Sequence, residues 1–301
     1  MKTEITELNA IGEFRDGIAA RVGLTRRWSQ LLAVAVVVLV VFVGGAFAGG
    51  WLKMWFLAGL LWLALKLILL PVATPLRQVL WFAWPGTDER AFFAGRSKGS
   101  DDDGIAGVAN ILVGVGLFVW GVMMVDATPI AGAWLAMAGI VFLLHFGTFR
   151  ILARLFRCQG IEARPILDFP LIADSLSDFW GNRWNRGFNV PARRHLFLPL
   201  VRTCGATWAT MAVFAVSGLL HEVVISLPAG GGYGLPSIYF LIQGLGVLVE
   251  RHLDSPMLKR VFTYVVLLLP VALLFHPPFI HNVMLPFLET ASAIGKNLPW
   301  K

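Results

Sequence analysis

A histidine lies at the end of a polar stripe inside an otherwise apolar part of the sequence. The stripe recurs at intervals of three and four residues, so its members share one helix face: Thr203, Thr207, Thr210, Phe214, Ser217 and His221. Such a face turns toward a helix bundle or a wet cavity, because lipid offers it no hydrogen bonds. A neutral imidazole can take a proton from a hydroxyl near neutral pH. The stripe indicates either a general base at His221, with Glu222 beside it, or a histidine that only hydrogen-bonds between helices.

A second run of aromatic and polar side chains precedes this stripe, at residues 178–185. It reads Asp-Phe-Trp-Gly-Asn-Arg-Trp-Asn, and Ser175 and Asp178 have the spacing of a helix cap. One continuous helix would separate an aromatic side from a polar side: Trp180, Trp184 and Phe188 against Asp178, Gly181, Asn182 and Asn185. Asparagine and arginine among large aromatic groups are costly without specific partners. The run predicts either a functional polar face or an interfacial helix whose asparagines are solvated.

The other reactive residue types form no recognisable site. The sequence contains no Gly-x-Gly-x-x-Gly, Walker, His-Glu-x-x-His or Cys-x-x-Cys pattern, and Cys158 and Cys204 match no metal spacing. We expect no metal and a reduced, inert pair of cysteines. His145 has Val141 and Thr148 as its helical neighbours, which favours a packing role.

The composition places these residues in a membrane. Of 301 residues, 57% are hydrophobic and 14% charged, against about 25% charged in ordinary soluble domains, so a water-soluble enzyme is excluded. A bilayer crossing takes about 20 apolar residues. Seven stretches qualify: 31–51, 51–76, 104–125, 127–149, 203–220, 235–249 and 261–280. We predict an all-α, polytopic integral membrane protein with about seven to nine transmembrane helices, forming one domain over residues 1–301.

The basic residues alternate along the chain as membrane topology requires. Four segments hold 21 of the 25 Lys and Arg residues: 1–30, 77–103, 150–202 and 250–260. The loops between them, near Gly49, Asp126 and 228–234, hold none. Basic loops stay in the cytoplasm, which predicts a cytoplasmic N-terminus and an outside C-terminus, in a bacterial inner membrane or its equivalent. The net charge of +7 therefore reflects orientation and predicts no nucleic-acid partner.

Two of these basic segments are predicted to lie at the membrane surface. Residues 1–30 are too acidic for a secretory signal and predict a cytoplasmic amphipathic helix. Residues 150–202 predict a cytoplasmic or re-entrant segment that enters the helix 203–227, which carries the histidine. Segment 150–202 begins with three arginines on one helix face: Arg150, Arg154 and Arg157. They indicate a lipid-headgroup anchor or a site for a phosphorylated carrier such as coenzyme A. Pro165 and Pro170 then break the chain.

The polar run and the histidine stripe together resemble a known family. The run 178–185, followed by Ser-Gly-Leu-Leu-His-Glu at 217–222, is similar to the membrane-bound O-acyltransferase superfamily, and most to its wax synthase branch. Trp81-Phe-Ala-Trp-Pro-Gly86 also looks like a tryptophan-proline-glycine turn of that branch. The resemblance extends over residues 80–225. Asn182 departs from the arginine that is common in the family.

The resemblance implies an activity and roles for individual residues. A fatty acyl chain would move from acyl-CoA, the co-substrate, to the hydroxyl of a long-chain alcohol, giving a wax-ester-like lipid without a cofactor. His221 would be the general base, and Asn185 would orient the acceptor or polarise the carbonyl. The substrate-binding residues would be Asp178, Trp180, Gly181, Arg183, Trp184, Ser217 and Glu222. The arginines of 183–202 would meet acyl-CoA from the cytoplasm while the alcohol enters from the bilayer.

Other functions remain compatible with the sequence. A sterol, a diacylglycerol or another hydroxyl would need the same base. A haem-binding redox protein is an alternative because His145 and His221 lie in neighbouring spans. A lipid transporter would show inverted repeats, and the two halves show no self-similarity.

Overall fold

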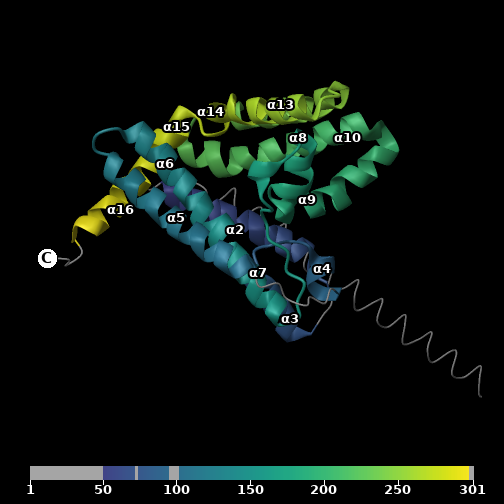
Figure 1. Cartoon of the computed structure of the whole chain (residues 1–301), viewed down its shortest axis with the longest axis horizontal. Coiled ribbons are helices and arrows are strands. Elements are labelled where there is room, and N and C mark those ends of the chain that lie inside the picture. Colours follow the sequence, from purple (N-terminus) through teal and green to yellow (C-terminus); the bar gives the residue numbers. More distant parts are fainter. Residues whose placement is uncertain (1–49, 72–73, 95–101, 298–301) are drawn as a thin grey trace, which may run out of the picture.

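The chain folds into helices joined by short connections (Figure 1). The computed structural model describes residues 50–71, 74–94 and 102–297, which contain no strand. The helices before the polar run are α2 (Gly50–Ile68), α3 (Pro75–Ala83), α4 (Glu89–Ala94), α5 (Asp102–Met124), α6 (Pro129–Val141), η1 (Phe142–Thr148), α7 (Phe149–Cys158) and η2 (Pro170–Ile172). Those that follow are α8 (Leu176–Asp178), η3 (Phe179–Arg183), α9 (Arg186–Ala192), η4 (Arg193–Phe197), α10 (Leu198–His221), η5 (Glu222–Ser226), α11 (Leu227–Ala229), α12 (Leu235–Val249), η6 (Glu250–His252), α13 (Pro256–Leu268), α14 (Val271–Leu274), α15 (Pro277–Phe279), η7 (Ile280–Met284) and α16 (Leu285–Asn297).

Five helical stretches of the described chain are long and apolar enough to cross a membrane. They are Gly50–Ile68, Gly104–Met124, Pro129–Cys158, Arg186–Ala229 and Pro256–Leu274. An all-helical membrane protein is confirmed, whereas the expected seven to nine spans are not. Residues 31–49 of the first predicted span, and the predicted surface helix 1–30, lie outside the described residues. The predicted span 235–249 forms α12, which has only 15 residues.

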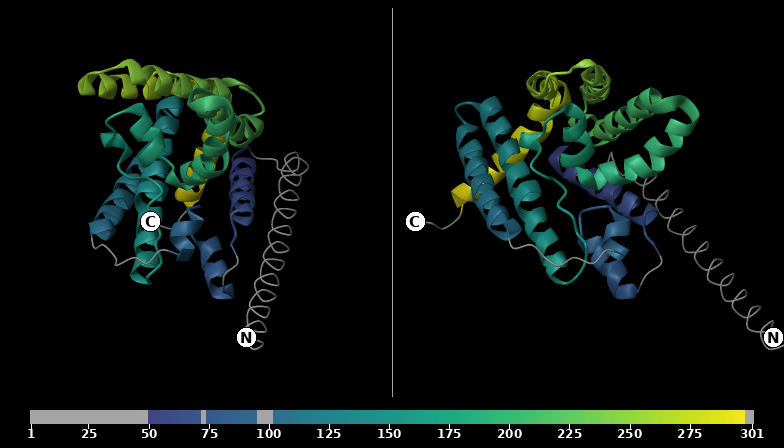
Figure 2. Two further views of the ribbon diagram at one scale, coloured as in Figure 1. Left: turned by 90° about the vertical axis from the view of Figure 1, so that its right-hand side faces the viewer. Right: turned by 45° about the vertical axis from the view of Figure 1, so that its right-hand side comes forward.

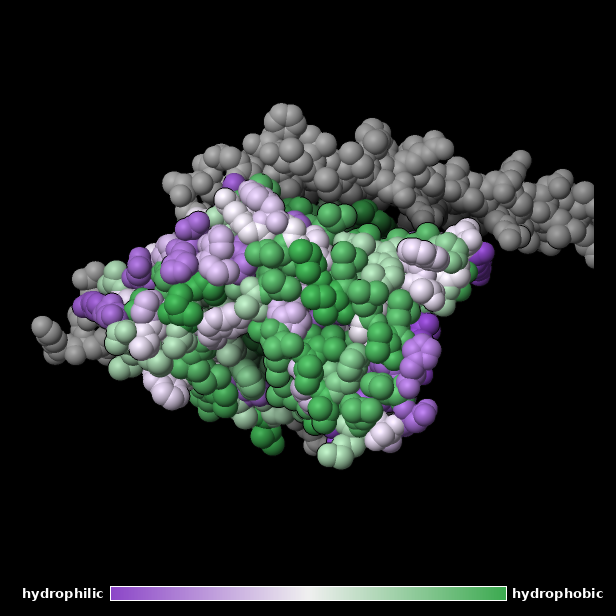
Figure 3. Space-filling view, turned by 90° about the horizontal axis from the view of Figure 1, so that it is seen from above, coloured by the Kyte–Doolittle hydropathy of each residue, from purple (hydrophilic) through white to green (hydrophobic). Residues whose placement is uncertain are grey.

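The apolar surface agrees with a membrane environment (Figure 3). Hydrophobic side chains form a broad band across this face, and hydrophilic side chains gather at its two ends. Large apolar side chains on α5 and α13 point outward, with Ile105 82% and Leu268 63% exposed. Such exposure in water would promote aggregation, so these faces are suited to contact lipid.

Ion pairs join three of the segments that are rich in basic residues. Arg194 on η4 forms an ion pair with Glu89 on α4, which joins segment 150–202 to segment 77–103. Arg260 pairs with Asp174, which joins segment 250–260 to segment 150–202. The predicted orientation of these segments toward the cytoplasm stays a prediction.

The C-terminal helices contact two of the connections that hold no basic residue. Lys296 near the end of α16 lies 3.4 Å from the carboxylate of Asp126, in the loop between α5 and α6. The side-chain amide of Asn282 on η7 donates to the carbonyl of Ala229 on α11 at 2.8 Å.

The arginine-rich helix is part of a span and not a separate surface helix. α6, η1 and α7 run as one apolar stretch from Pro129 to Cys158. Arg150 and Arg157 are buried, and the guanidinium of Arg150 lies 4.4 Å from the ring centre of Phe169. The predicted face of three arginines therefore packs within the protein over part of its length, because the helix does not end where the charges begin.

Lys66 lies inside the predicted span 51–76, where a lysine near the end of a span is ordinarily expected to extend toward the interface. It is fully buried, and its ammonium group donates to the carbonyl of Trp81 at 2.9 Å and to that of Gly86. The ammonium also lies 3.3 Å from the ring centre of Trp81, a cation–π contact. Lys66 thereby fixes the tryptophan-proline-glycine turn against α2.

The long stretch Arg186–Ala229 is bent, and the bend shapes the site. Gly205 has φ 79° and ψ 167°, a backbone conformation that only glycine adopts readily. The chain reverses there, so α9 and η4 lie beside the remainder of α10 (Figure 2). The predicted stripe is interrupted as a result. Thr203 and Thr207 are exposed near the bend, whereas its members from Thr210 onward face inward.

The polar run is likewise broken and does not form one helix. The predicted cap is confirmed, because the hydroxyl of Ser175 accepts from the backbone N–H of Asp178 at 3.0 Å. The helix then ends at Trp184, which is extended, and Asn185 adopts a left-handed conformation with φ 44°. A new helix, α9, begins at Arg186. The predicted separation of an aromatic side from a polar side is therefore wrong, and both kinds of side chain face one cavity.

Candidate active site

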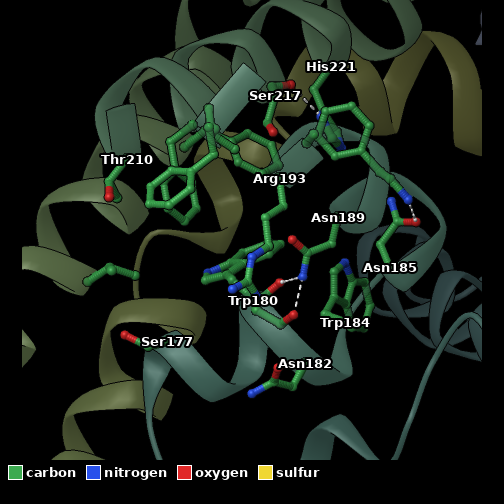
Figure 4. A pocket seen from close by; sticks show the side chains of 18 of the residues that line it. Ser177, Trp180, Asn182, Trp184, Asn185, Asn189, Arg193, Thr210, Ser217 and His221 are labelled. Carbon is green, nitrogen blue, oxygen red and sulfur yellow. Dashed lines mark hydrogen bonds between the residues drawn. The ribbon is translucent and has the colours of Figure 1, made fainter. Parts of the chain in front are cut away.

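The two arms of the bent stretch, the polar run and α12 enclose a cavity of about 380 Å³ (Figure 4). Both sequence elements that suggested chemistry contribute to it. Its lining residues are Ser177, Trp180, Gly181, Asn182, Trp184, Asn185, Phe188, Asn189, Ala192, Arg193, Phe197, Thr210, Val213, Phe214, Ser217, His221, Phe240, Val247 and Arg251. Aromatic and aliphatic side chains make up about half of the lining residues, and polar or charged side chains make up most of the rest.

His221 presents one ring nitrogen to the protein and keeps the other available. Its Nδ1 lies 2.7 Å from the carbonyl oxygen of Ser217, one helical turn earlier (Figure 4). A carbonyl can only accept, so the neutral ring carries its proton on Nδ1 and a lone pair on Nε2. The ring also packs on Phe240 with centroids 4.3 Å apart. These contacts fix the tautomer and the orientation that a general base needs.

Asn185 contributes to the local fold and to the cavity at the same time. Its side-chain oxygen accepts from the backbone N–H of Phe188 at 3.2 Å and so caps α9. Asparagine also tolerates the left-handed backbone found here. Because the oxygen is engaged in the cap, the amide nitrogen Nδ2 is the group that can donate to a bound molecule.

Trp180 and Gly181 are held in the wall by polar contacts. The side-chain amide of Asn189 donates to the carbonyl of Trp180 at 2.7 Å and to that of Gly181 (Figure 4). The Trp180 indole N–H donates to the buried side chain of Gln243 at 3.3 Å. A Cβ atom at Gly181 would have no neighbour within 4 Å, so the glycine leaves open space at this wall.

Three of the predicted site residues lie outside the lining. Asp178 and Arg183 pair with each other, and Arg183 also donates to the backbone carbonyl of Asp168 at 3.4 Å. Burial by itself would raise the pKa of Asp178. Hydrogen bonds from Arg183, from Asn182 and from the backbone of Asp174 outweigh it and hold the pKa below its usual value. This pair supports the turn of the polar run.

Glu222 is the third, and it faces away from His221 despite its neighbouring position. One carboxylate oxygen accepts from the backbone N–H groups of Gly234 and Ser237 at 3.1 and 3.0 Å, and from the Ser237 hydroxyl at 2.8 Å. These donors belong to the N-terminus of α12. The carboxylate therefore joins the histidine helix to α12 and does not contact the imidazole.

Two residues of the cavity were missed by the sequence. Arg251 was predicted only as part of a basic loop and Phe240 only as part of an apolar span, because they come from helices that the fold brings to the site. Arg193, one of the arginines of 183–202 that the resemblance implies would meet acyl-CoA, also lines the cavity. Arg193 and Arg251 form no ion pair among the described residues, whereas Arg183, Arg186 and Arg194 are engaged by carboxylates.

The remaining histidines and cysteines form no second centre in the part of the chain that is described. No group of three His, Cys, Asp or Glu residues there is placed to hold a metal ion. His145 packs edge-on against Phe149 with centroids 5.2 Å apart and does not line the cavity. Cys158 and Cys204 are free and exposed.

The cavity combines the groups that proton-coupled attack on a carbonyl requires. An imidazole nitrogen with a lone pair can accept the proton of a hydroxyl, and an amide N–H can stabilise a developing oxyanion. Aromatic walls exclude water and accommodate hydrocarbon chains. The guanidinium groups of Arg193 and Arg251, which form no ion pair in the described part of the chain, can bind an anionic group such as a phosphate.

The chain is similar to known acyltransferases over this region. Residues 163–242 match the model of the membrane bound O-acyl transferase family. A probable long-chain-alcohol O-fatty-acyltransferase 7 of Arabidopsis thaliana is 27% identical over 146 residues, 41% of this chain and 42% of that protein. A probable long-chain-alcohol O-fatty-acyltransferase 8 of the same plant is 32% identical over 122 residues, 35% of this chain and 36% of that protein.

A relative with another acceptor is similar over a comparable region. The acyl-CoA–sterol O-acyltransferase 1 of Arabidopsis thaliana is 28% identical over 155 residues, 46% of this chain and 45% of that protein. The alignments thus span less than half the length of these curated relatives. The matched residues 163–242 contain Asn185, His221 and most of the cavity lining.

Proposed function

We propose that the chain transfers a fatty acyl group from acyl-CoA to the hydroxyl of a lipophilic alcohol, since residues 163–242 match the model of the membrane bound O-acyl transferase family. The observation that carries the proposal is the Nε2 of His221, which has no hydrogen-bond partner among the described residues, in the cavity that Asn185 also lines. The family segment supports the reaction class. The cavity supports the assignment of roles to residues.

In the proposed reaction, Nε2 of His221 accepts the proton of the acceptor hydroxyl as its oxygen attacks the thioester carbonyl carbon. The carbonyl becomes an oxyanion, to which Nδ2 of Asn185 donates a hydrogen bond. The carbon–sulfur bond then breaks, the carbonyl re-forms as an ester, and the imidazolium returns the proton to the coenzyme A thiolate. No external oxidant or metal takes part.

Different parts of the cavity suit different parts of the substrates. We assign the phosphates of acyl-CoA to Arg193 and Arg251, which lie on segments predicted to face the cytoplasm. The hydrocarbon chains would lie against the aromatic and aliphatic walls, which Phe214 and Phe240 represent. A chain with its N-terminus in the cytoplasm would then receive acyl-CoA from the cytoplasm and the alcohol from the bilayer.

We favour a long-chain alcohol as acceptor, since seven of the similar proteins are named for that substrate and one for a sterol. A sterol or a diacylglycerol would use the same base. The product class therefore has to be read from the assay and not from the mechanism.

The test uses detergent-purified protein with labelled palmitoyl-CoA and, in parallel, hexadecanol, a sterol or a diacylglycerol. We expect ester with hexadecanol, and a decrease of about 10²- to 10⁴-fold in kcat for His221→Ala, because general-base catalysis contributes roughly this much. His281→Ala is the matched control, since His281 is exposed on η7 and lies outside the cavity. Ester formation that is unchanged in His221→Ala would contradict the assigned base.

A further inference from the structure

The helix α12 contacts both segments that supply the reacting groups. Phe240 packs on the His221 ring, and its own ring lies 5.6 Å from that of Trp180. Gln243, one turn later, accepts from the Trp180 indole and donates to the carbonyl of Val266 at 2.8 Å. A single helix face thus lies between the histidine helix and the polar run.

Each end of α12 is joined to one of these segments by a carboxylate. At its start, Glu222 binds the backbone of Gly234 and Ser237, as described above. Directly after its end, Glu250 accepts from the backbone N–H of Leu176 and, through its other oxygen, from the N–H of Ser177 at 3.1 Å and its hydroxyl at 2.6 Å. The two contacts use the same chemistry, a carboxylate that binds two N–H groups and one serine hydroxyl.

Glu250 completes the hydrogen bonding of the first turn of the polar run. The first N–H groups of a helix have no partner within the helix. Here Leu176 and Ser177 donate to Glu250, and Asp178 donates to the Ser175 hydroxyl. Glu250 is only 4% exposed and forms no ion pair among the described residues, so its charge is compensated by these donors. A buried carboxylate without such donors would be strongly disfavoured.

Further polar contacts join this region to the following helices, but none of them reaches the first turn of the run. The indole N–H of Trp180 donates to Gln243 farther along the run, and the Tyr264 hydroxyl donates to the carbonyl of Leu171 before it. Asp174 pairs with Arg260, but their side chains are 70% and 59% exposed, and such pairs contribute little. The α8 helix has three residues and cannot fix its own position. The buried contact with Glu250 therefore decides where the run begins relative to α12.

We propose that Glu250 is a positioning residue for the acyl transfer. It sets the polar run, which carries Trp180 and ends at Asn185, in register with His221 through α12. The inference rests on the proposed function, because it concerns the same reaction. Misplacement of a reacting group by about 1 Å can decrease a rate by about 10²-fold, so a small shift of the run is enough to matter.

Glu250→Gln tests the role with little change of shape. The glutamine keeps one acceptor oxygen, but its NH₂ group meets a backbone N–H that can no longer donate to it. We expect kcat for ester formation to fall about tenfold or more with KM for palmitoyl-CoA nearly unchanged. Hydrolysis of palmitoyl-CoA should rise relative to ester formation, because water is less demanding in its alignment. If the variant only contained less folded protein, the rates of ester formation and of hydrolysis would fall by the same factor.

Two further variants keep the test decisive. Glu289→Gln makes the same chemical change at an exposed position of α16 and should match the wild type. Ser177→Ala removes only the hydroxyl contact, so it should lower kcat less than Glu250→Gln. Combined with Glu250→Gln it should add less than its own effect, because the two changes break one network.

Hydrogen exchange reports how firmly the hydrogen bonds of the polar run are held, independently of activity. In Glu250→Gln the amides of residues 176–184 should exchange faster, with the α5–α6 hairpin unchanged. Faster exchange with wild-type kcat, or no change in either measurement, would overturn the positioning role and leave the proposed function intact. A wild-type protein that forms no ester with any acceptor would overturn the proposed function, and the positioning role with it.

Discussion

Substitutions of Asn185 can separate its two contributions, the cap of α9 and the donor in the cavity. Asn185→Ala removes both and places alanine in a left-handed conformation. Asn185→Gly tolerates that conformation and also removes the donor. Asn185→Asp keeps a capping oxygen at the same place and replaces the NH₂ group by a second oxygen. The three variants should therefore differ in stability while sharing the loss of the donor.

The magnitudes follow from the contacts of Asn185. Loss of an N-cap to alanine costs about 1 kcal/mol of unfolding free energy, and loss to glycine a few tenths. The single hydrogen bond from Phe188 at 3.2 Å makes Asn185 an ordinary cap. Loss of one oxyanion donor decreases kcat by about 10²- to 10³-fold, or roughly 3 to 4 kcal/mol of transition-state stabilisation. The effect on activity should therefore exceed the effect on stability in every variant.

The assay is kcat for ester formation from palmitoyl-CoA and hexadecanol, with thermal unfolding of the same detergent-purified samples. We expect Asn185→Asp and Asn185→Gly to unfold near the wild-type temperature and to lose about 10²-fold or more in kcat. Asn185→Ala should lose activity and also unfold earlier. A kcat within about threefold of wild type for Asn185→Gly would refute the donor role and leave Asn185 as a structural residue.

Two further predictions concern the wall of the cavity and the support of the polar run. Gly181→Leu should fold, since a Cβ atom there meets nothing within 4 Å. It should lower the ratio of kcat/KM for hexadecanol to kcat/KM for decanol about tenfold. An unchanged ratio would show that the hydrocarbon chain of the alcohol does not lie at this wall. Asp178→Asn should destabilise the protein by on the order of 1 kcal/mol at neutral pH, because the partly exposed pair with Arg183 is lost. Since the pKa of Asp178 is lowered on folding, this stabilisation is present above the unfolded pKa and is lost as pH falls below about 4. The unfolding temperatures of wild type and Asp178→Asn should therefore converge at low pH. A difference that stays constant with pH would contradict the role of the ion pair.

The part of the site that follows from helical periodicity could be predicted from the sequence. Thr210, Ser217 and His221 repeat at helical spacing, and all three line the cavity. Within one helix, residue spacing determines which side chains share a face.

The breaks in the helices could not be predicted in the same way. The cavity depends on a positive φ at Gly205 and at Asn185. The sequence contains 31 glycines, and nothing local distinguishes the one that reverses the chain. Periodicity therefore predicted the polar run as one helix. In the structure the helix ends before Trp184, which is extended, and a new helix begins at Arg186.

Contacts between segments that are far apart in the sequence could not be predicted either. Glu250 binds Leu176 across 74 positions, and Arg251 reaches the cavity from the end of α12. Glu250 was counted only as part of a charged loop, because burial by tertiary packing has no signature in neighbouring residues. Lys66 illustrates the same limit, since a lysine near a span end is ordinarily expected to extend toward water.

The adjacent positions of His221 and Glu222 have a consequence for how the histidine helix can move. Successive helical residues point about 100° apart, so one side chain faces the substrates while the next is anchored in the backbone of α12. Any rotation of the helix about its axis that swung the imidazole away would also pull the carboxylate from its donors. The hydrogen bonds of Glu222 to α12 therefore restrict rotation of the helix about its axis. They hold the side chain of His221, the proposed base, in the direction of the cavity.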